Sequence, residues 1–296
     1  MSDLTAAIRL DGETRVAGVI GWPVRHSLSP PMHNAAFAAL GLNWVYVPFA
    51  VAPEQIAACV AAVRALDLAG LNVTIPHKPA VLPHLDELGP EARALGVANT
   101  IINRDGHLLG RSTDGEGFLR SLREIGGDAA DAVVTLIGAG GSARSVALAM
   151  AQAGASRLAV VNRTVAKAEA LAAMIGELVP ACDVVAVPLE GEAAREVVSG
   201  ASVVIDSTAV GMYPHADVPP VVPAEWLHSG QIVCDLTYNP RQTVLLQAAT
   251  AQGARTLDGT GMLVHQGALA FEYWTGQEAP VEVMRTALLN RLGEGP

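Results

Sequence analysis

The feature that most constrains the fold is a glycine-rich turn directly after a buried strand. The run Ala132–Ile137 is almost wholly apolar, which predicts a strand covered on both faces. Gly138-Ala-Gly-Gly-Ser-Ala143 follows at once, and a helical pattern over Ser142–Ala153 begins there. A second apolar run, Arg157–Val161, completes the unit. A strand, a helix and a second strand in this order form a crossover between parallel strands, so the chain must contain an α/β sheet.

The same alternation extends along most of the chain. Short apolar runs alternate with alanine-rich helical stretches, which predicts parallel sheets joined by crossover helices. No internal repeat interrupts it. The predicted strands are Arg15–Ile20, Trp44–Ala50, Ala69–Ile75, Ala132–Ile137, Arg157–Val161, Asp183–Val187, Ser202–Ile205 and Gln231–Leu236; the predicted helices are Pro31–Leu40, Pro53–Leu66, Ser142–Ala153, Val165–Gly176 and Thr243–Gln252.

The chain is long enough for two domains. Its 296 residues compare with about 150 residues for one domain. We place the boundary near Thr113–Gly117, where a helix entered at Glu116 leads into a new strand–helix–strand unit. The final stretch, Leu263–Leu292, is helical with no strand after it. We expect this stretch to pack back onto the first domain.

Composition excludes several classes of partner. The chain has 29 acidic residues against 19 Lys and Arg, a net charge of −10, so neither nucleic acid nor an anionic membrane is an expected partner. No apolar run approaches the roughly 18 residues that a membrane-spanning helix needs. The start of the chain, Met1–Leu4, has no basic region followed by an apolar stretch, so we expect no export signal and a soluble, cytoplasmic protein.

Metal and acyl-transfer chemistry are also not expected. Cys59, Cys182 and Cys234 are too few and too scattered for a disulfide framework or a zinc site. The histidines lack metal-binding spacing; the pairs His26–His33 and His77–His84 are interpreted as unrelated surface positions. No nucleophile elbow is present.

The glycine-rich turn indicates a dinucleotide site of the Rossmann type. Its small residues let the backbone approach a pyrophosphate, and the following helix offers free N–H groups and the positive end of its dipole. A site for NAD usually has an acidic residue about 20 positions after the glycines. Here no Asp or Glu occurs from Ala139 to Ala168. The turn is predicted to bind the cofactor through Gly138, Ala139, Gly140, Gly141 and Ser142.

The end of the second strand predicts which dinucleotide is bound. Asn162-Arg163-Thr164 ends the strand and Lys167 follows one turn later, in a region with an excess of acidic residues. Arg163 and Lys167 suit a 2′-phosphate, with the side chains of Asn162 and Thr164 as hydrogen-bond donors. The alternative is that Thr164 caps a helix and Arg163 is simply solvated. We predict NADP rather than NAD.

Polar residues in the first half of the chain suit a small polar substrate. Ser27 and Ser29 precede a helix, where hydroxyl groups suit a carboxylate. Ser29 before Pro30 is also an ordinary N-cap, which leaves Ser27 unexplained. Asn72 and Thr74 share one face of a strand, where asparagine is disfavoured. The pairs Asn99-Thr100 and Thr113-Asp114 add further polar groups.

Lys78 is the strongest candidate for a proton donor. The chain uses Arg seventeen times but Lys only at positions 78 and 167. An ammonium group has an adjustable pKa that a guanidinium lacks, so a lysine at 78 suggests proton transfer. Asp114 is its natural partner, since a carboxylate would orient the ammonium. Chance placement of the two lysines is the alternative.

Taken together, these segments resemble the shikimate dehydrogenase family over nearly the whole chain. The resemblance implies reversible reduction of 3-dehydroshikimate to shikimate with NADPH, the fourth step of chorismate and aromatic amino acid biosynthesis. The matching segments are Gly21-Trp-Pro-Val-Arg-His-Ser-Leu-Ser-Pro30 with His33-Asn34, Asn72-Val-Thr-Ile-Pro-His-Lys78, Val97-Ala-Asn-Thr100, Ser112-Thr-Asp-Gly115, Gly138–Ser142, Asn162-Arg-Thr164, Tyr238-Asn-Pro240 and Asp258-Gly-Thr-Gly-Met-Leu-Val-His-Gln266.

The resemblance also assigns roles. Ser27 and Ser29 would hold the substrate carboxylate, and Tyr238 would close the pocket. Lys78 and Asp114 look like the catalytic pair. Residues 1–114 with 259–296 would form a substrate-binding α/β domain, and 115–258 a doubly wound, NADP-binding Rossmann domain. The other residues implied are Asn72, Thr74, Asn99 and Gln266 for the ring hydroxyls and Thr208, Gly259 and Met262 for the cofactor.

The chain departs from the family pattern at one position. Asp206-Ser207-Thr208 stands where the family often has Asn, a small residue and Thr. The Asp206 carboxylate would either weaken cofactor binding or bond to backbone amides.

Two rival functions are a quinate/shikimate dehydrogenase with relaxed cofactor use and a non-catalytic NADP-binding sensor. The presence of Lys78 and Asp114 disfavours the sensor. A monomer or a homodimer is expected.

Overall fold

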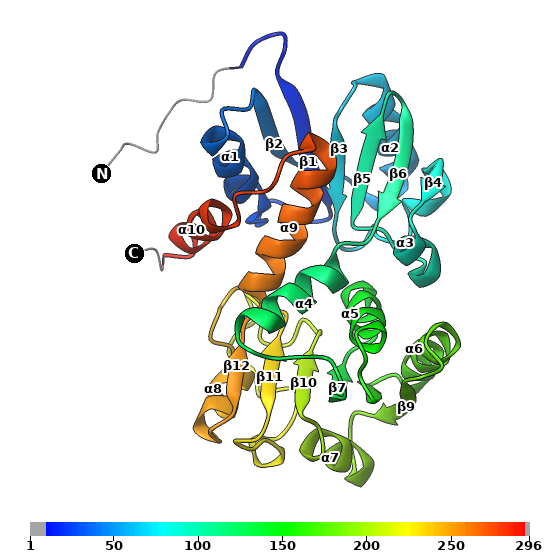
Figure 1. The fold of residues 1–296 in the computed structure, drawn as a ribbon, viewed down its shortest axis with the longest axis vertical. Coiled ribbons are helices and arrows are strands. Elements are labelled where there is room, and N and C mark those ends of the chain that lie inside the picture. Colours follow the sequence, from blue (N-terminus) through cyan, green and yellow to red (C-terminus); the bar gives the residue numbers. More distant parts are fainter. Residues whose placement is uncertain (1–9, 294–296) are drawn as a thin grey trace. The chain divides into compact units, whose positions relative to one another are not determined.

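The computed structural model describes residues 10–293, which form two compact units (Figure 1). Unit 1 consists of the described residues up to Thr113 and from Val264 onward; unit 2 is Asp114–Leu263. Met1–Leu4, on which the expectation of no export signal rests, lie outside the described residues. Among the helices of residues 10–293, none combines the length and apolar character that crossing a bilayer requires.

Unit 2 contains a fully parallel six-stranded sheet in the order β12-β11-β10-β7-β8-β9. Counted from the first strand of the unit, this is the doubly wound order 3-2-1-4-5-6, in which strand order reverses between β7 and β10. The predicted α/β doubly wound fold is therefore confirmed. Its strands are β7 (Val133–Ile137), β8 (Arg157–Asn162), β9 (Asp183–Pro188), β10 (Val203–Asp206), β11 (Ile232–Asp235) and β12 (Arg255–Leu257).

The first helix of unit 2 leads into β7, and the next four connect strands of the sheet as crossovers (Figure 1). β-branched residues fill the strands, and small residues on the helices let them pack closely, so that a core of Val, Ile, Leu and Ala forms. The helices are α4 (Asp114–Glu124), α5 (Gly141–Gln152), α6 (Val165–Leu178), α7 (Glu192–Ser199) and α8 (Val244–Ala251), with a 3₁₀ turn at Ala224–Trp226.

Unit 1 contains a mixed sheet, so the expectation of parallel sheets was wrong for part of it. β1 pairs in parallel with β2 and β3, but β5 is antiparallel to both β3 and β6. The Asp105-Gly106 turn, whose φ angles of 52° and 87° match a two-residue hairpin, makes β6 antiparallel to β5. The order is β2-β1-β3-β5-β6-β4, with β1 (Arg15–Gly21), β2 (Trp44–Ala50), β3 (Gly70–Val73), β4 (Glu87–Leu88), β5 (Thr100–Arg104) and β6 (His107–Arg111).

The helices of unit 1 place several predicted substrate residues. Helix α1 precedes β2, and α10 near the C-terminus packs against α1. Helix α9 begins in unit 2 and continues into unit 1. The bounds are α1 (Ser29–Ala39), α2 (Ile56–Ala65), α3 (Pro90–Leu95), α9 (Gly259–Thr275) and α10 (Val281–Arg291), with 3₁₀ turns at Pro53–Gln55 and Leu82–His84.

Candidate functional site

The glycine-rich turn lies at the point where the strand order of unit 2 reverses. Gly138 follows β7 with a φ of 108°, a conformation that residues with a side chain rarely adopt. Its N–H donates to the carbonyl of Val161 at 2.8 Å, and a Cβ at this position would clash with the hydroxyl of Ser207. A glycine is therefore required where the turn passes between β7 and the segment after β10.

The start of α5 suits an anion. Its N-cap is Gly140 in an extended conformation, without a capping side chain, and a Cβ built there meets no atom within 4 Å. The first N–H groups of a helix have no partner within the helix, and its dipole favours negative charge there. Ala139 and Gly141 flank Gly140 and are half-buried. The open space above these donors fits a dinucleotide pyrophosphate.

The same turn contacts the predicted catalytic carboxylate. The Ser142 hydroxyl donates to Asp114 Oδ2 at 3.4 Å. Asp114 is the first residue of α4 and is 5% exposed. Gly115 lets α4 approach α5, since a Cβ there would meet the carbonyl oxygen of Ser145 at 2.5 Å. Asp114 and Ser142, predicted for different roles, are thus brought together within unit 2.

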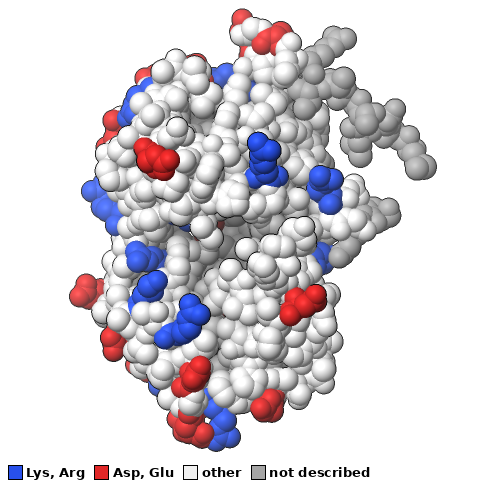
Figure 2. All heavy atoms as spheres, turned by 180° about the vertical axis from the view of Figure 1, so that it is seen from behind, with Lys and Arg blue, Asp and Glu red and all other residues white. Residues whose placement is uncertain are grey.

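The predicted 2′-phosphate residues lie at the end of β8 and the start of α6. Asn162 is half-buried and donates from Nδ2 to the Thr164 carbonyl at 2.9 Å; Arg163, Thr164 and Lys167 are exposed. Thr164 occupies the N-cap position of α6, but its side chain makes no capping hydrogen bond. The capping alternative therefore does not account for this threonine. Figure 2 shows basic side chains gathering on the face of unit 2 that carries this region.

Thr208, Gly259, Met262 and Tyr238 also lie in unit 2. Thr208 is half-buried after β10, and its hydroxyl accepts from the Val210 N–H at 3.1 Å. The Gly259 N–H donates to the Thr237 carbonyl at 2.9 Å, and a Cβ on Gly259 would clash with the Leu236 carbonyl. Met262 is buried on α9. Burial raises the pKa of the Tyr238 phenol, which therefore stays protonated.

Asp206 ends β10 and is 1% exposed, beside Asp235, which ends β11. The two are register partners on neighbouring parallel strands, so their side chains leave the same face of the sheet. Asp206 Oδ1 accepts the Thr208 N–H at 2.8 Å, which resolves the open alternative in favour of a bond to a backbone amide. Burial first, and then the charge of Asp235, raise the pKa of Asp206 to about 7.

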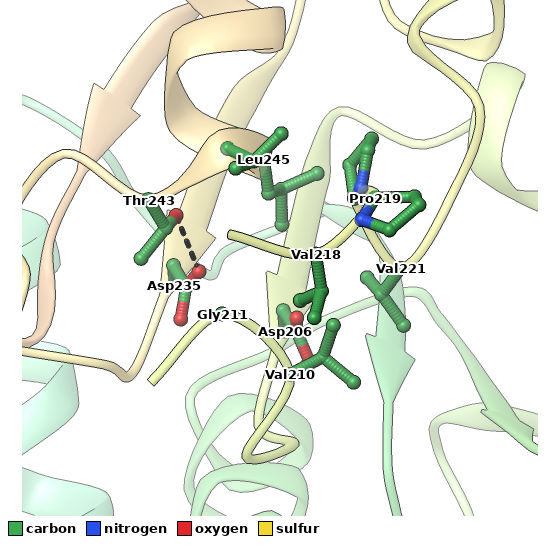
Figure 3. Close-up of a pocket in the computed structure, with 11 residues that line it drawn as sticks. Asp206, Val210, Gly211, Val218, Pro219, Val221, Asp235, Thr243 and Leu245 are labelled. Carbon is green, nitrogen blue, oxygen red and sulfur yellow. Dashed lines mark hydrogen bonds between the residues drawn. The ribbon is translucent and has the colours of Figure 1, made fainter. Parts of the chain in front are cut away.

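Both carboxylates line a small pocket with a mainly apolar wall (Figure 3). The Thr243 hydroxyl donates to Asp235 Oδ2 at 2.7 Å, and the Thr237 N–H donates to Oδ1 at 2.9 Å. These donors partly offset the burial that raises the pKa of Asp235. The apolar wall consists of Val210, Val218, Pro219, Pro220, Val221, Val244 and Leu245.

In unit 1 the two predicted serines lie next to each other. The Ser29 N–H donates to Ser27 Oγ at 3.3 Å; Ser29 is buried and Ser27 half-buried. The alternative interpretation of Ser29 as an N-cap was wrong, because α1 begins at Ser29 and its N-cap is Leu28, with no side-chain capping bond. Capping therefore does not explain the Ser29 hydroxyl, while the Ser27 hydroxyl accepts the first N–H of α1.

Asn72 and Asn99 belong to one hydrogen-bonded network. Asn72 Nδ2 donates to Thr100 Oγ1 at 3.1 Å and to the Asn99 carbonyl at 3.3 Å. Asn99 Nδ2 donates to Thr113 Oγ1 at 2.9 Å and, from its other side, Asn99 Oδ1 accepts the Thr113 N–H at 2.8 Å. Gln266 of α9 accepts from Asn99 Nδ2 at 3.4 Å. The structure thus brings three of the predicted substrate residues together.

Lys78 and Thr74 lie in the segment after β3, and both are half-buried. The Thr74 N–H donates to the Ile20 carbonyl at 2.9 Å, and the Thr74 carbonyl accepts the His77 N–H at 2.9 Å. The Lys78 carbonyl accepts the Ala98 N–H at 3.0 Å. The backbone bonds tie this segment to β1 and to the start of the Asn99 segment.

Two histidines were wrongly interpreted as surface positions. His33 is 0% and His77 1% exposed. His77 Nε2 lies 2.8 Å from the Val51 carbonyl, a bond that fastens the loop before Lys78. Among the described residues, no group of three or more His, Cys, Asp or Glu is placed to hold a metal ion.

Sequence reasoning missed Tyr46 and Asp235. Tyr46 of β2 donates from its hydroxyl to Asn72 Oδ1 at 2.7 Å. The pattern of Trp44–Ala50 shows only an apolar strand, but a buried tyrosine needs a partner for its hydroxyl, and that requirement is the signal that could have found it. Asp235, after three apolar residues of a buried strand, gives a similar signal.

Comparison with known proteins covers both units. The model of the shikimate dehydrogenase substrate binding domain matches residues 19–101, that of shikimate / quinate 5-dehydrogenase matches 121–214, and that of the shikimate 5′-dehydrogenase C-terminal domain matches 259–289. The shikimate dehydrogenase (NADP(+)) of Methanopyrus kandleri is 48% identical over 98% of this chain and 100% of its own length.

Solved structures agree with these matches. A shikimate dehydrogenase crystallised with NADP⁺ has a TM-score of 0.90 and 42% identity, over 96% of this chain and 98% of the other. The shikimate 5-dehydrogenase of Listeria monocytogenes, in complex with shikimate and NAD, has a TM-score of 0.88 and 38% identity, over 93% and 96%. With such identity over nearly its whole length, the chain belongs to the shikimate dehydrogenase family.

Proposed function

We propose that this chain is an NADP-dependent oxidoreductase that interconverts 3-dehydroshikimate and shikimate in chorismate and aromatic amino acid biosynthesis. The observation that carries the proposal is the pairing of two sites in one chain. Unit 2 has a glycine turn and an open helix start where its strand order reverses, and unit 1 has a buried network of amides and hydroxyls. The first suits a dinucleotide and the second a polyhydroxylated ring.

The cofactor residues divide by the part of NADP that they suit. Gly138–Ser142 and the start of α5 bind the pyrophosphate, and Arg163 and Lys167, with Asn162 and Thr164, bind the 2′-phosphate. Thr208, Gly259 and Met262 border the nicotinamide. When bound, the nicotinamide supplies or accepts the hydride. The domain roles follow: residues 1–114 with 259–296 bind substrate, and 115–258 bind NADP.

The substrate residues hold the ring and move one proton. Ser27 and Ser29 bind the carboxylate; Asn72, Thr74, Asn99 and Gln266 bind the hydroxyls; Tyr238 closes the pocket. During reduction Lys78 donates a proton to the carbonyl oxygen, and in the reverse direction it accepts that proton. Asp114 orients the ammonium of Lys78 and stabilises its charged form. Small-molecule substrates, a cytoplasmic location and a monomeric or homodimeric state complete the proposal.

The first experiment measures reduction of nicotinamide by its near-ultraviolet absorbance, with purified protein and shikimate, once with NADP⁺ and once with NAD⁺. Reduction of NADP⁺ alone supports both the reaction and the role of Arg163 and Lys167. Equal rates with both cofactors, or turnover of quinate, would favour a quinate/shikimate dehydrogenase of relaxed cofactor use. Binding of NADP without any turnover would favour a sensor.

A further inference from the structure

Tyr46 bonds to one of the predicted substrate residues of unit 1. Its side chain is 1% exposed, on the middle of β2. The phenol donates to Asn72 Oδ1 at 2.7 Å. Burial keeps the phenol protonated, because it raises the pKa of Tyr46 well above its ordinary value. The phenol therefore bonds to a residue that is predicted to bind a substrate hydroxyl.

Two consecutive residues of α1 hold Tyr46 in place. Asn34 accepts the Tyr46 N–H at 2.8 Å and donates to the Tyr46 carbonyl at 2.9 Å, so its side chain clamps the backbone of β2. The His33 ring stacks on the Tyr46 ring at 4.2 Å with 9° between the planes. His33 is fully buried, which lowers its pKa to about 3 and keeps the ring neutral. The His33-Asn34 pair thus fixes both the backbone and the ring of Tyr46.

The bond from Tyr46 determines how Asn72 can present its amide. An asparagine side chain can donate two hydrogen bonds and accept two. Asn72 Nδ2 donates to Thr100 Oγ1 and to the Asn99 carbonyl, and Oδ1 accepts the phenol. These contacts leave one lone pair on Oδ1, which suits a substrate hydroxyl as donor. Without the phenol, the nitrogen and oxygen could exchange places.

We propose that Tyr46 is a positioning residue, which sets substrate affinity by orienting Asn72 while it does not touch the substrate itself. The inference rests on the proposed function, since shikimate is the ligand that Asn72 would bind. An oriented amide acts on the bound substrate and the transition state alike. Loss of the orientation should therefore raise KM more than it lowers kcat.

The test is Tyr46→Phe, which removes one oxygen and keeps the ring on His33. We expect the KM for shikimate to rise about tenfold, which corresponds to one buried hydrogen bond. The KM for NADP⁺ and kcat should change by less than about twofold. Tyr273→Phe is the matched control, because Tyr273 is a half-buried tyrosine of α9 whose ring contacts Arg111. Its KM for shikimate should equal that of the wild type.

A double-mutant cycle separates positioning from a general structural effect. If Tyr46 acts through its partners, Tyr46→Phe should raise KM much less in an Asn72→Ala background than in the wild type. If the effects of the two substitutions on the KM for shikimate were fully additive, the positioning role of Tyr46 would be wrong. It would also be wrong if Tyr46→Phe raised the KM for shikimate and the KM for NADP⁺ equally. If the wild type is active and Tyr46→Phe has the same KM for shikimate, the role of Tyr46 is wrong but the proposed function stands. A wild type that neither binds nor turns over shikimate overturns the proposed function, and the role of Tyr46 with it.

Discussion

The two units differ in the kind of polar group that they bury at their candidate sites. In unit 1 the buried groups are neutral amides and hydroxyls that bond to one another, as between Asn72 and Thr100 or Asn99 and Thr113. In unit 2 they are carboxylates. The neighbouring strands β10 and β11 end in Asp206 and Asp235, and Asp258 directly follows the adjacent β12.

Each of these carboxylates accepts the backbone N–H of a threonine two residues later. The distances are 2.8 Å for Asp206 with Thr208, 2.9 Å for Asp235 with Thr237, and 2.9 Å for Asp258 with Thr260. Asp258 also forms an ion pair with Arg241, whose Nε lies 2.8 Å from Oδ2. Among the contacts described for Asp206, the charged neighbour is instead another carboxylate, Asp235.

The difference indicates where each unit is sensitive to its surroundings. Neutral groups that satisfy one another are indifferent to pH over the range in which proteins fold. Ionising both of two buried carboxylates on adjacent strands is unfavourable in free energy, so one of them keeps a proton. We therefore expect substrate binding in unit 1 to depend on hydrogen-bond geometry. We expect the stability of unit 2 to depend on whether the carboxylates at its strand ends are protonated.

The largest expected effect comes from the one charged group among the predicted substrate residues of unit 1. Lys78→Met should lower kcat by about 10²- to 10⁴-fold, the usual contribution of a positioned proton donor. The melting temperature and the KM for NADP⁺ should change little, because Lys78 is half-buried in a loop. Steady-state kinetics with shikimate measure the effect.

Lys167→Met is the matched control for Lys78→Met. Lys167 is the other lysine of the chain and is exposed near the start of α6. Its replacement should raise the KM for NADP⁺ and leave kcat nearly unchanged. If both lysine variants kept the kcat of the wild type, proton donation by Lys78 would be wrong.

The next effect concerns pH and Asp206. Its pKa of about 7 in the folded state lies above its ordinary value of 3.8. Between these two pH values the folded state therefore holds a proton that the unfolded state has lost. Stability should therefore be full below about pH 4, fall as pH rises, and level off above about pH 7, with a total loss of at most about 4 kcal/mol. Asp206→Asn, which mimics the neutral carboxyl, should remove this slope.

Urea unfolding at several pH values checks this expectation. The free energy of unfolding of Asp206→Asn should increase relative to that of the wild type as pH rises, because only the wild type loses a buried proton. Asp217→Asn is the control, since it removes one negative charge at an exposed position. Parallel stability curves for the wild type and Asp206→Asn would show that the carboxylate pair does not hold a proton in this range.

The fold of unit 2 could be predicted largely from the sequence, and that of unit 1 only in part. Continuous apolar runs and the glycine turn identify five of the parallel strands of unit 2 and the helices α5, α6 and α8, but not α7. Strand β5 was not predicted, because it contains Asn103, which is buried and donates to the Leu68 carbonyl at 2.8 Å. A polar residue with a partner 35 positions away breaks the local pattern. The dipeptide Asp105-Gly106, which is typical of a hairpin turn, could have predicted the hairpin of β5 and β6.

The site divides in the same way. Ser27, Asn72, Lys78 and Asn99 stand in short local motifs, and motifs can be recognised without knowing the fold. Tyr46 matters through Asn72, which lies 26 positions away on the far side of strand β1. Asp235 matters through Asp206, which lies 29 positions away on the neighbouring strand β10. Strand register, which local patterns do not reveal, makes these pairs.

The glycine turn allows a further comparison within unit 2. Gly138→Ala should destabilise the protein by about 2–4 kcal/mol, because its φ of 108° is strained for alanine and the Cβ would clash with Ser207. Gly140→Ala should cost less, about 0.5–1 kcal/mol, since a Cβ there meets open space at a helix N-cap. Thermal unfolding of both variants measures the difference.

Gly140→Ala should nevertheless raise the KM for NADP⁺, because its Cβ would enter the space above the α5 N–H groups. The two glycines thus separate stability from cofactor affinity. Equal stability of the two variants would show that the turn is not strained at Gly138. An unchanged KM for NADP⁺ in Gly140→Ala would place the pyrophosphate elsewhere.

The smallest effect sharpens the distinction between the two cofactors. Arg163 is exposed at the end of β8, and one charge-assisted bond to a 2′-phosphate corresponds to about a tenfold change in affinity. Arg163→Gln should therefore raise the KM for NADP⁺ about tenfold and leave the much weaker use of NAD⁺ unchanged, because NAD⁺ lacks that phosphate. Arg157→Gln, at the opposite end of the same strand and paired with Asp183, should affect neither cofactor. An equal loss with both cofactors would mean that Arg163 supports the fold of the turn rather than the phosphate, and the predicted preference for NADP would then rest on Lys167.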